Sequence, residues 1–167
     1  MGFDVINKLS EKYNIPVQKN GLDSLYGTGT IENEKVMLIK PQTYMNLSGV
    51  AIKKFIDYYK IDISKLIIIY DDIDLEPGTV KVRKTGGAGT HNGMKSVVSE
   101  VGTTEFIHIR IGTGKPEIKT DLINYVIGKI SKEEYLSLQD AIETGAEAVE
   151  QILKNGIDKA MNYINAK

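Results

Sequence analysis

Hydrophobic positions in the first third of the chain follow helical spacing in two segments and strand-like clustering in two others. Residues 2–13 place their apolar side chains on one face, which predicts a short amphipathic helix. Residues 25–31 and 35–40 are rich in β-forming residues and flank Glu32-Asn33-Glu34, which predicts a hairpin. Residues 46–59 return to helical spacing and predict a second helix.

The middle of the chain alternates between predicted strands and helices. A continuous apolar run over residues 65–70 predicts a strand that is buried on both faces. Residues 79–84 alternate apolar and basic side chains, which predicts a half-buried strand with a basic outer face. A short helix over residues 94–101 and a further strand over residues 105–112 are predicted next.

Residues typical of helix ends mark the boundaries of these helices. Thr43 or Asn46 is a candidate cap for the helix over residues 46–59. Ser131 and Glu134 have the spacing of a capping box, and Gly156 is a candidate C-terminal cap for the long helix that follows them. Strands that alternate with helices predict an α/β fold with a twisted mixed β-sheet packed between α-helices.

Composition narrows the class of protein. A chain of 167 residues that is 41% hydrophobic predicts a single domain over residues 1–167 with a substantial core. The absence of cysteine excludes disulfides, thiolate metal sites and cysteine nucleophiles. No apolar run approaches the length of a membrane span, so we expect a soluble cytoplasmic protein.

Charge is unevenly distributed along the chain. The totals, 21 basic and 22 acidic residues, argue against a protein coated in basic side chains. Residues 77–99 nevertheless contain no Asp or Glu and carry four basic residues, Lys81, Arg83, Lys84 and Lys95. This acid-free window suggests a focused contact with a polyanion, although a solvated strand that happens to lack acids is an equal alternative.

Two groups of polar residues are candidates for chemistry. Asp71, Asp72 and Asp74 follow the buried strand, where an acid can orient a histidine, hold a metal or cap a turn. A metal site is the weakest of these, because the chain has only two histidines and no metal-ligand spacing. His91 lies in a glycine-rich loop beside Asn92 and is either a general base or a loop residue without a role.

Common catalytic and nucleotide-binding fingerprints do not match. The glycine-rich loop fails the dinucleotide-binding pattern, and the segment around Gly114-Lys115 fails the P-loop pattern. No GxSxG elbow is present, which argues against an acyl-enzyme hydrolase. His108 shares a strand face with Arg110 and is interpreted as structural.

Four motifs, in this order and at this spacing, resemble one family. They are KPQTYMNLSG at residues 40–49, YDDIDLEPG at residues 70–78, GGAGTHNGMKSV at residues 86–97 and RIGTGKP at residues 110–116. Together they resemble bacterial peptidyl-tRNA hydrolase over essentially the whole chain. The resemblance implies a monomeric α/β enzyme that uses no metal or organic cofactor. Such an enzyme hydrolyses the ester between a peptide and the 3′ ribose of tRNA, which recycles tRNA from stalled or dropped-off chains.

The resemblance also implies roles for residues at the carboxyl end of the buried strand. Tyr44 and Asn46 are expected to contact the 3′ end of the substrate, and His91 is grouped with these binding residues. Asn92 is expected to bind the same region or to position the attacking water. Asp71 is expected to hold a catalytic histidine in its basic, correctly oriented form.

The basic residues have an implied role of their own. Lys81, Arg83 and Arg110 are expected to meet the phosphates of the tRNA acceptor end, in agreement with the acid-free window. The resulting expectation is a contact with the backbone of peptidyl-tRNA rather than with its bases.

The sequence departs from the family at its start. The family opens with a GxGNPGxxY segment and a TRHN motif that carries the catalytic histidine, and Met1-Gly2-Phe3 matches the stretch just after that histidine. We therefore expect an N-terminally truncated domain with impaired hydrolysis. The first explanation is a start placed too late, which the intact motifs favour, and the second is a truly short chain.

Two other classes of function stay open from sequence. A catalytically silent RNA-binding module of the same fold accounts for the basic window as well as an enzyme does. Asp71 argues weakly for the enzyme, because a pure binding protein needs no orienting acid. A small-ligand or nucleotide-binding α/β domain is the third class, and the failed glycine fingerprints count against it.

Overall fold

The computed structural model describes residues 1–89, 91–114 and 132–167. The helices are α1 (Gly2–Tyr13), α2 (Ser48–Tyr59), α3 (Asn92–Val101), α5 (Lys132–Asn155) and α6 (Ile157–Asn165), with 3₁₀ turns η1 (Met45–Leu47) and η2 (Ile63–Lys65). The strands are β1 (Lys19–Gly21), β2 (Ser24–Ile31), β3 (Glu34–Pro41), β4 (Ile67–Asp72), β5 (Val80–Arg83) and β6 (Ile107–Gly112). These elements match those predicted, while the predicted capping box at Ser131 lies outside the described residues.

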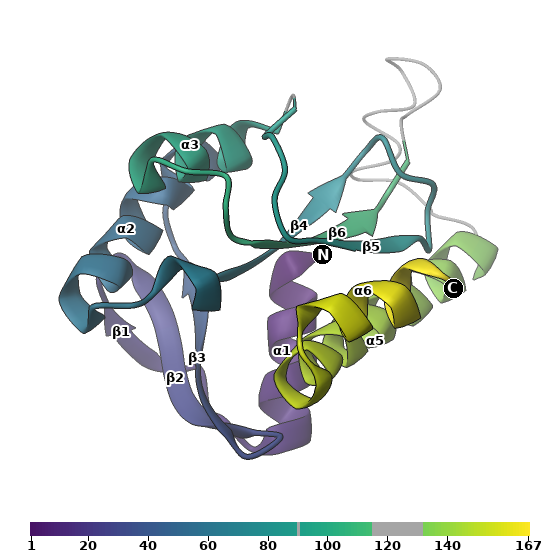
Figure 1. Cartoon of the computed structure of the whole chain (residues 1–167), viewed down its shortest axis with the longest axis horizontal. Coiled ribbons are helices and arrows are strands. Elements are labelled where there is room, and N and C mark those ends of the chain that lie inside the picture. The colour runs from purple at the N-terminus through teal and green to yellow at the C-terminus, as the bar shows by residue number, and fades with distance from the viewer. Residues whose placement is uncertain (90, 115–131) are drawn as a thin grey trace.

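The α/β prediction is confirmed, with the strands divided between two three-stranded sheets (Figure 1). One sheet is antiparallel, in the order β1-β2-β3, and contains the predicted hairpin. Glu32 and Asn33 form its two-residue turn with φ of 51° and 64°, the left-handed geometry that matches the twist of paired strands. The other sheet is mixed: β6 lies between β4, which is parallel to it, and β5, which is antiparallel.

The prediction that residues 65–70 form a strand buried on both faces is wrong. Every residue of β4 is only partly buried. β4 pairs with β6 along one edge, and no strand in the described part of the chain pairs with its other edge. A strand at the edge of a sheet keeps one side open, so an apolar run alone does not ensure burial.

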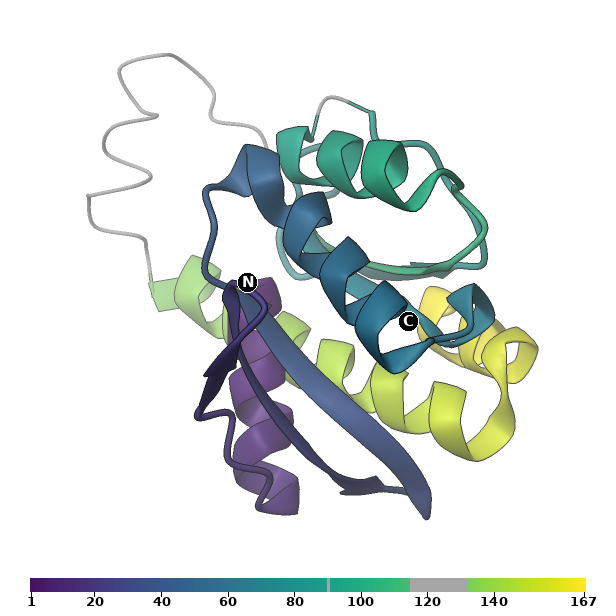
Figure 2. The same ribbon diagram turned by 90° about the vertical axis from the view of Figure 1, so that its left-hand side faces the viewer.

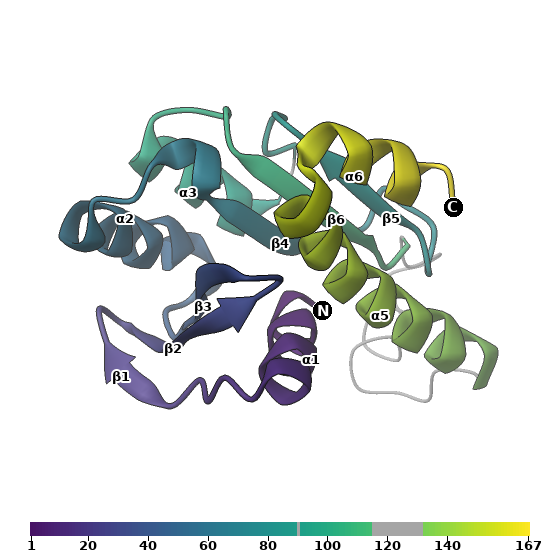
Figure 3. The same ribbon diagram turned by 60° about the horizontal axis from the view of Figure 1, so that its bottom comes forward.

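Helices cover both faces of the mixed sheet (Figures 1 and 3). The larger core gathers α1, α5 and α6 against one face of β5 and β6, with Ile109 and Ile111 fully buried in it. The smaller core places Met94 and Val97 of α3 against Phe106 and the opposite face. This layering follows from the alternation of β6, whose odd-numbered side chains face one way and whose even-numbered side chains face the other.

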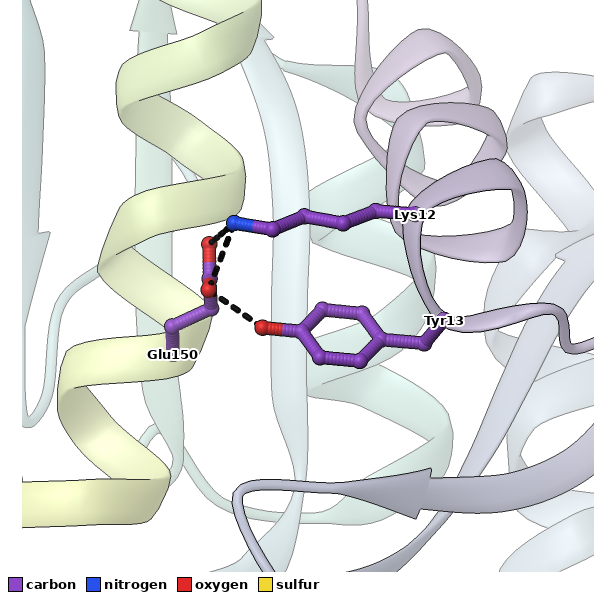
Figure 4. A network of polar contacts seen from close by, with 3 residues as sticks. All are labelled: Lys12, Tyr13 and Glu150. Atoms are coloured by element: carbon purple, nitrogen blue, oxygen red, sulfur yellow. Dashed lines mark hydrogen bonds and ion pairs between the residues drawn. The ribbon is translucent and has the colours of Figure 1, made fainter.

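Polar contacts fix the helices of the larger core. Glu150 of α5 accepts hydrogen bonds from Lys12 Nζ, at 2.9 and 3.1 Å, and from the Tyr13 hydroxyl at the end of α1 (Figure 4). Burial, together with the bond to Glu150, raises the pKa of Tyr13 well above its usual value. The side-chain amide of Asn165 both donates to the Val82 carbonyl and accepts from the Val82 amide, so α6 covers the outer edge of β5 (Figure 3).

Gly49 allows α2 and α3 to lie side by side (Figure 2). Its amide donates to Ser96 Oγ at 2.9 Å, and a Cβ atom at position 49 would lie only 2.1 Å from the Ser96 carbonyl oxygen. Neither Thr43 nor Asn46 caps α2, contrary to prediction, because η1 precedes the helix and its N-cap position falls on Leu47.

We expect Gly49→Ala to destabilise the protein by about 1–3 kcal/mol, since the overlap is with backbone and the two helices have to separate. Urea denaturation measures the change. Gly87→Ala is the matched control, because a Cβ atom there has no neighbour within 4 Å, and its effect should stay within about 0.5 kcal/mol. Equal stabilities for the two variants would contradict this account of the helix pair.

Candidate active site at the carboxyl end of β4

Asp71 lies at the end of β4, as predicted, with 44% of its side chain exposed. Its Oδ1 atom is shielded from solvent and lies 3.0 Å from the Met1 amino nitrogen. Apart from that ion pair, Oδ1 has no partner among the residues the structure describes. Asp71 therefore keeps a carboxylate oxygen available at the point where α1 begins.

Asp72 points to the other face of the sheet and is tied to Arg110. Arg110 Nε donates to Asp72 Oδ2 at 2.6 Å, and Nη2 lies 2.5 Å from the same oxygen. The Asp72 side chain is only 10% exposed, so the pair is largely desolvated. The Asp72 carboxylate offsets much of the charge that Arg110 was predicted to offer to phosphates.

The glycine-rich loop leads into the N-terminus of α3. His91 is the N-cap residue: its Nδ1 atom accepts a hydrogen bond from the Met94 amide at 3.1 Å. Asn92 is the first residue of α3 and its side chain is exposed. The loop thus presents both residues at a helix end where backbone amides are unpaired.

The motif around η1 lies against this helix end. Tyr44 is 83% exposed, and Asn46 is also exposed. A Cβ atom at Gly93 would lie 2.5 Å from Met45 Sδ and 2.9 Å from His91 Cε1, so the Met45 side chain packs beside the His91 ring. The structure therefore brings the segment with Tyr44 and Asn46 next to the segment with His91 and Asn92.

The predicted basic face lies on β5, at the edge of the mixed sheet. Lys81 is the register partner of Arg110 across β5 and β6, and its Nζ atom donates to the Asn165 carbonyl at 3.0 Å. Lys84 forms an ion pair with Asp158 of α6. Arg83 is exposed and has no ion-pair partner within residues 1–89, 91–114 and 132–167. Arg83 is therefore the most available cation of this strand.

Sequence reasoning missed Tyr70, the residue that links the two histidines. Its ring centroid lies 5.3 Å from that of His91, with the ring planes at 70°. Its hydroxyl lies 3.3 Å from Nδ1 of His108, which is 1% exposed, in agreement with the prediction that His108 is structural. A signal was available, because Tyr70 and His108 fall on the same face of neighbouring strands.

Burial lowers the pKa of both histidines below the usual value. The carboxylates of Asp71 and Asp72 oppose this shift at His91. At His108 the Thr104 carbonyl opposes the shift and the charge of Arg110 adds to it. Both rings are consequently neutral near pH 7.

The lowered values predict how stability varies with pH. The unfolded chain binds protons at these histidines near pH 6.5 while the folded chain does not, so the free energy of unfolding falls as the pH drops through that value. Each histidine contributes a slope of at most about 1.4 kcal/mol per pH unit. Urea denaturation at pH 7.5 and pH 5.5 measures the effect. It should be smaller in the His108→Gln variant, and stability that rises on acidification would contradict the prediction.

No group of three or more His, Cys, Asp or Glu side chains in the described part of the chain is arranged to hold a metal ion. No helix in that part is long and apolar enough to cross a membrane.

Comparisons with known proteins identify the family. The family model described as peptidyl-tRNA hydrolase matches residues 1–167. A peptidyl-tRNA hydrolase from Clostridium novyi is 46% identical over 165 residues, which cover 99% of this chain and 87% of the relative. One from Bacillus subtilis is 42% identical over 167 residues, which cover 89% of the relative. The crystal structure of peptidyl-tRNA hydrolase from Acinetobacter baumannii superposes with a TM-score of 0.88 at 33% identity, covering 98% of this chain and 84% of that one. The chain belongs to the peptidyl-tRNA hydrolase family.

Proposed function

We propose that this chain binds the 3′ end of peptidyl-tRNA at the carboxyl end of β4 and serves the hydrolysis of its ester bond. In that reaction a water oxygen attacks the ester carbonyl carbon, and the bond from that carbon to the ribose 3′ oxygen breaks. The peptide leaves with a carboxyl group, and a proton is transferred to the 3′ oxygen. The observation that carries the proposal is the convergence of the η1 motif, Asp71 and the N-terminus of α3 on one site.

Asp71 is the residue we assign to orienting the general base. A carboxylate that accepts a hydrogen bond from an imidazole fixes its tautomer and stabilises the cation formed on proton transfer. The shielded Oδ1 atom of Asp71 has this capacity, and it lies 3.0 Å from Met1. A histidine in a segment joined to Met1, as in the family motif, would therefore enter the site beside Asp71.

Tyr44, Asn46, His91 and Asn92 supply the contacts to the acyl and ribose end of the substrate. Their exposure and the closeness of η1 to α3 suit a ligand that lies across both segments. Amide side chains both donate and accept hydrogen bonds, as an ester carbonyl and ribose hydroxyls require. Asn92, at the start of α3, is in addition a candidate for positioning the attacking water.

Lys81, Arg83 and Arg110 supply the contact with tRNA phosphates. The three side chains share one face of the mixed sheet, because Lys81 pairs with Arg110 and Arg83 pairs with His108 in register. Such a face binds a phosphate backbone without reading sequence. A hollow between α1 and α5 is the less suitable surface, since five glutamates line it, Glu11, Glu32, Glu143, Glu147 and Glu150.

A tRNA-binding module without hydrolysis is the second candidate. One observation favours it for these 167 residues: the Nδ1 atom of His91 is already engaged by the Met94 amide. Neither His91 nor His108 is hydrogen-bonded to Asp71. We therefore expect the chain to bind N-acylaminoacyl-tRNA and to cleave it slowly.

The test measures binding and cleavage on one substrate, N-acetylaminoacyl-tRNA, under single-turnover conditions. Saturable binding with slow release of the acyl group is the expected result. Deacylated tRNA and a DNA duplex of similar length serve as control ligands. Absence of saturable tRNA binding would refute the proposed function, and rapid turnover would refute the expectation of slow cleavage.

A further inference from the structure

The two ring nitrogens of His91 have different environments. Nδ1 accepts the Met94 amide hydrogen at 3.1 Å, so this nitrogen carries no proton. In a neutral imidazole the proton then lies on Nε2, which makes that nitrogen a hydrogen-bond donor. Nε2 has no hydrogen-bond partner among the described residues, and the half-buried ring lies beside Met45 of the η1 motif. A neutral donor is thus presented at the proposed substrate site.

A second, buried hydrogen-bond chain lies behind this ring. His108 Nε2 lies 3.3 Å from the Thr104 carbonyl, which can only accept, so Nε2 donates and Nδ1 is bare. The Tyr70 hydroxyl, 3.3 Å from that Nδ1, must then be the donor. Burial raises the pKa of Tyr70, so the hydroxyl keeps its proton. Phe106 stacks on His108 at 4.3 Å and holds the imidazole in place.

We propose that His91 is a neutral Nε2–H donor to the acyl carbonyl of the substrate, and that Tyr70, held by His108, is the positioning residue that keeps its ring in place. The proposal rests on the proposed function, because it assigns His91 to the same substrate. It excludes His91 as the general base: accepting a proton at Nδ1 would break the helix cap, and Nε2 already carries one.

Charged groups from every described neighbour agree with the neutral state. Asp71 and Asp72 of β4 face His91 and favour its protonation, but burial outweighs them and keeps its pKa below the usual value. On the other side of Tyr70, Arg110 of β6 adds to the burial that keeps His108 neutral. Neither ring is therefore expected to be an imidazolium at pH 7.5.

The first test reads the tautomers directly. The chain has only two histidines, so a long-range ¹H–¹⁵N spectrum of the histidine-labelled protein shows two ring patterns. At pH 7.5 both should be neutral with the proton on Nε2. Tyr70→Phe should shift the Nδ1 signal of His108. A proton on Nδ1 of His91, or an imidazolium, overturns the proposal whatever the chain binds.

The second test separates the two nitrogens of His91 by substitution. Asn at an N-cap accepts from a backbone amide much as Nδ1 does but places no donor at Nε2, so His91→Asn should keep the cap. His91→Gln can place an amide donor near the Nε2 position while weakening the cap. The ligand is an acceptor-stem RNA that carries N-acetylphenylalanine through a stable 3′ amide, compared with the same RNA without the acyl group.

The measured quantity is the ratio of the two affinities, which a loss of folding alone does not change. His91→Asn should lower the preference for the acylated RNA by about 3- to 10-fold, while His91→Gln retains more of it and Tyr70→Phe gives a smaller fall. An unchanged ratio in His91→Asn overturns the proposal. If the wild-type chain binds neither RNA, the proposed function fails and the substrate role of His91 fails with it, whereas the tautomer result still stands by itself.

Discussion

Joining a histidine-bearing segment of the family type, GxGNPGxxY followed by TRHN, to Met1 should raise the rate of peptidyl-tRNA hydrolysis by about 10²–10⁴-fold. That range is what a positioned general base typically contributes. The structural reason is the position of Met1, whose amino nitrogen lies 3.0 Å from the shielded Oδ1 atom of Asp71. Single-turnover release of acetylated amino acid from tRNA, at equal protein concentrations, measures the gain.

Two variants of the joined chain test the origin of that gain. Changing the added histidine to alanine should remove it, and Asp71→Asn should remove most of it because the imidazole loses its orienting carboxylate. In the 167-residue chain the same Asp71→Asn change should alter the slow rate little. A joined chain that is no faster, or a gain that survives Asp71→Asn, would contradict the role assigned to Asp71.

Removing the two cations of β5 should weaken tRNA binding by about tenfold or more in the variant with both Lys81→Ala and Arg83→Ala. Each lost phosphate contact also lowers the slope of log affinity against log salt by about 0.9 for duplex RNA treated like B-DNA. Arg83 is exposed without an ion-pair partner in the described part of the chain, so we expect it to carry more of the effect. Filter binding between 50 and 200 mM salt, on the order of physiological strength, measures both quantities.

The control for this variant is Lys35→Ala, which removes an equal charge from the exposed hairpin end of β3. Its affinity and salt slope should stay near those of the wild type. Since Lys81 also donates to the Asn165 carbonyl, circular dichroism of the double variant verifies that α6 is still docked. A salt slope that does not change in the folded double variant would show that tRNA phosphates contact another surface.

Local sequence patterns predicted the elements of this fold well. The hairpin followed from β-forming runs around Glu32-Asn33, because two residues in left-handed geometry close such a turn. The helix ending before Gly156 also followed, since glycine adopts the positive φ of 86° found there. Both features depend on a few neighbouring residues, which is the range over which a sequence can be interpreted without its fold.

The predictions that failed depend on neighbours distant in sequence. The apolar run of β4 does not show that one edge of this strand lacks a partner among the described strands. The caps expected at Thr43 and Asn46 were displaced by η1, whose packing against α3 involves Met45 and Gly93. Neither fact could be derived from local spacing.

The candidate site shows the same division. Asp71 was located correctly because a strand end is a local feature. The pairing of Arg110 with Asp72 and the contact from Tyr70 to His108 arise only when β6 aligns with β4. Register between strands, rather than residue type, therefore decides which charges stay available for a ligand.

The most direct test of the central claim is to map where the 3′ end of the substrate binds. The ¹⁵N-labelled chain is titrated with an adenosine that carries N-acetylphenylalanine through a stable 3′ amide. We predict that the largest amide shifts fall on Tyr44, Asn46, Asp71 and Asn92, which come from three segments that meet at the carboxyl end of β4. Shifts confined to the glutamate-lined hollow between α1 and α5, or no saturable shifts at all, would contradict the account.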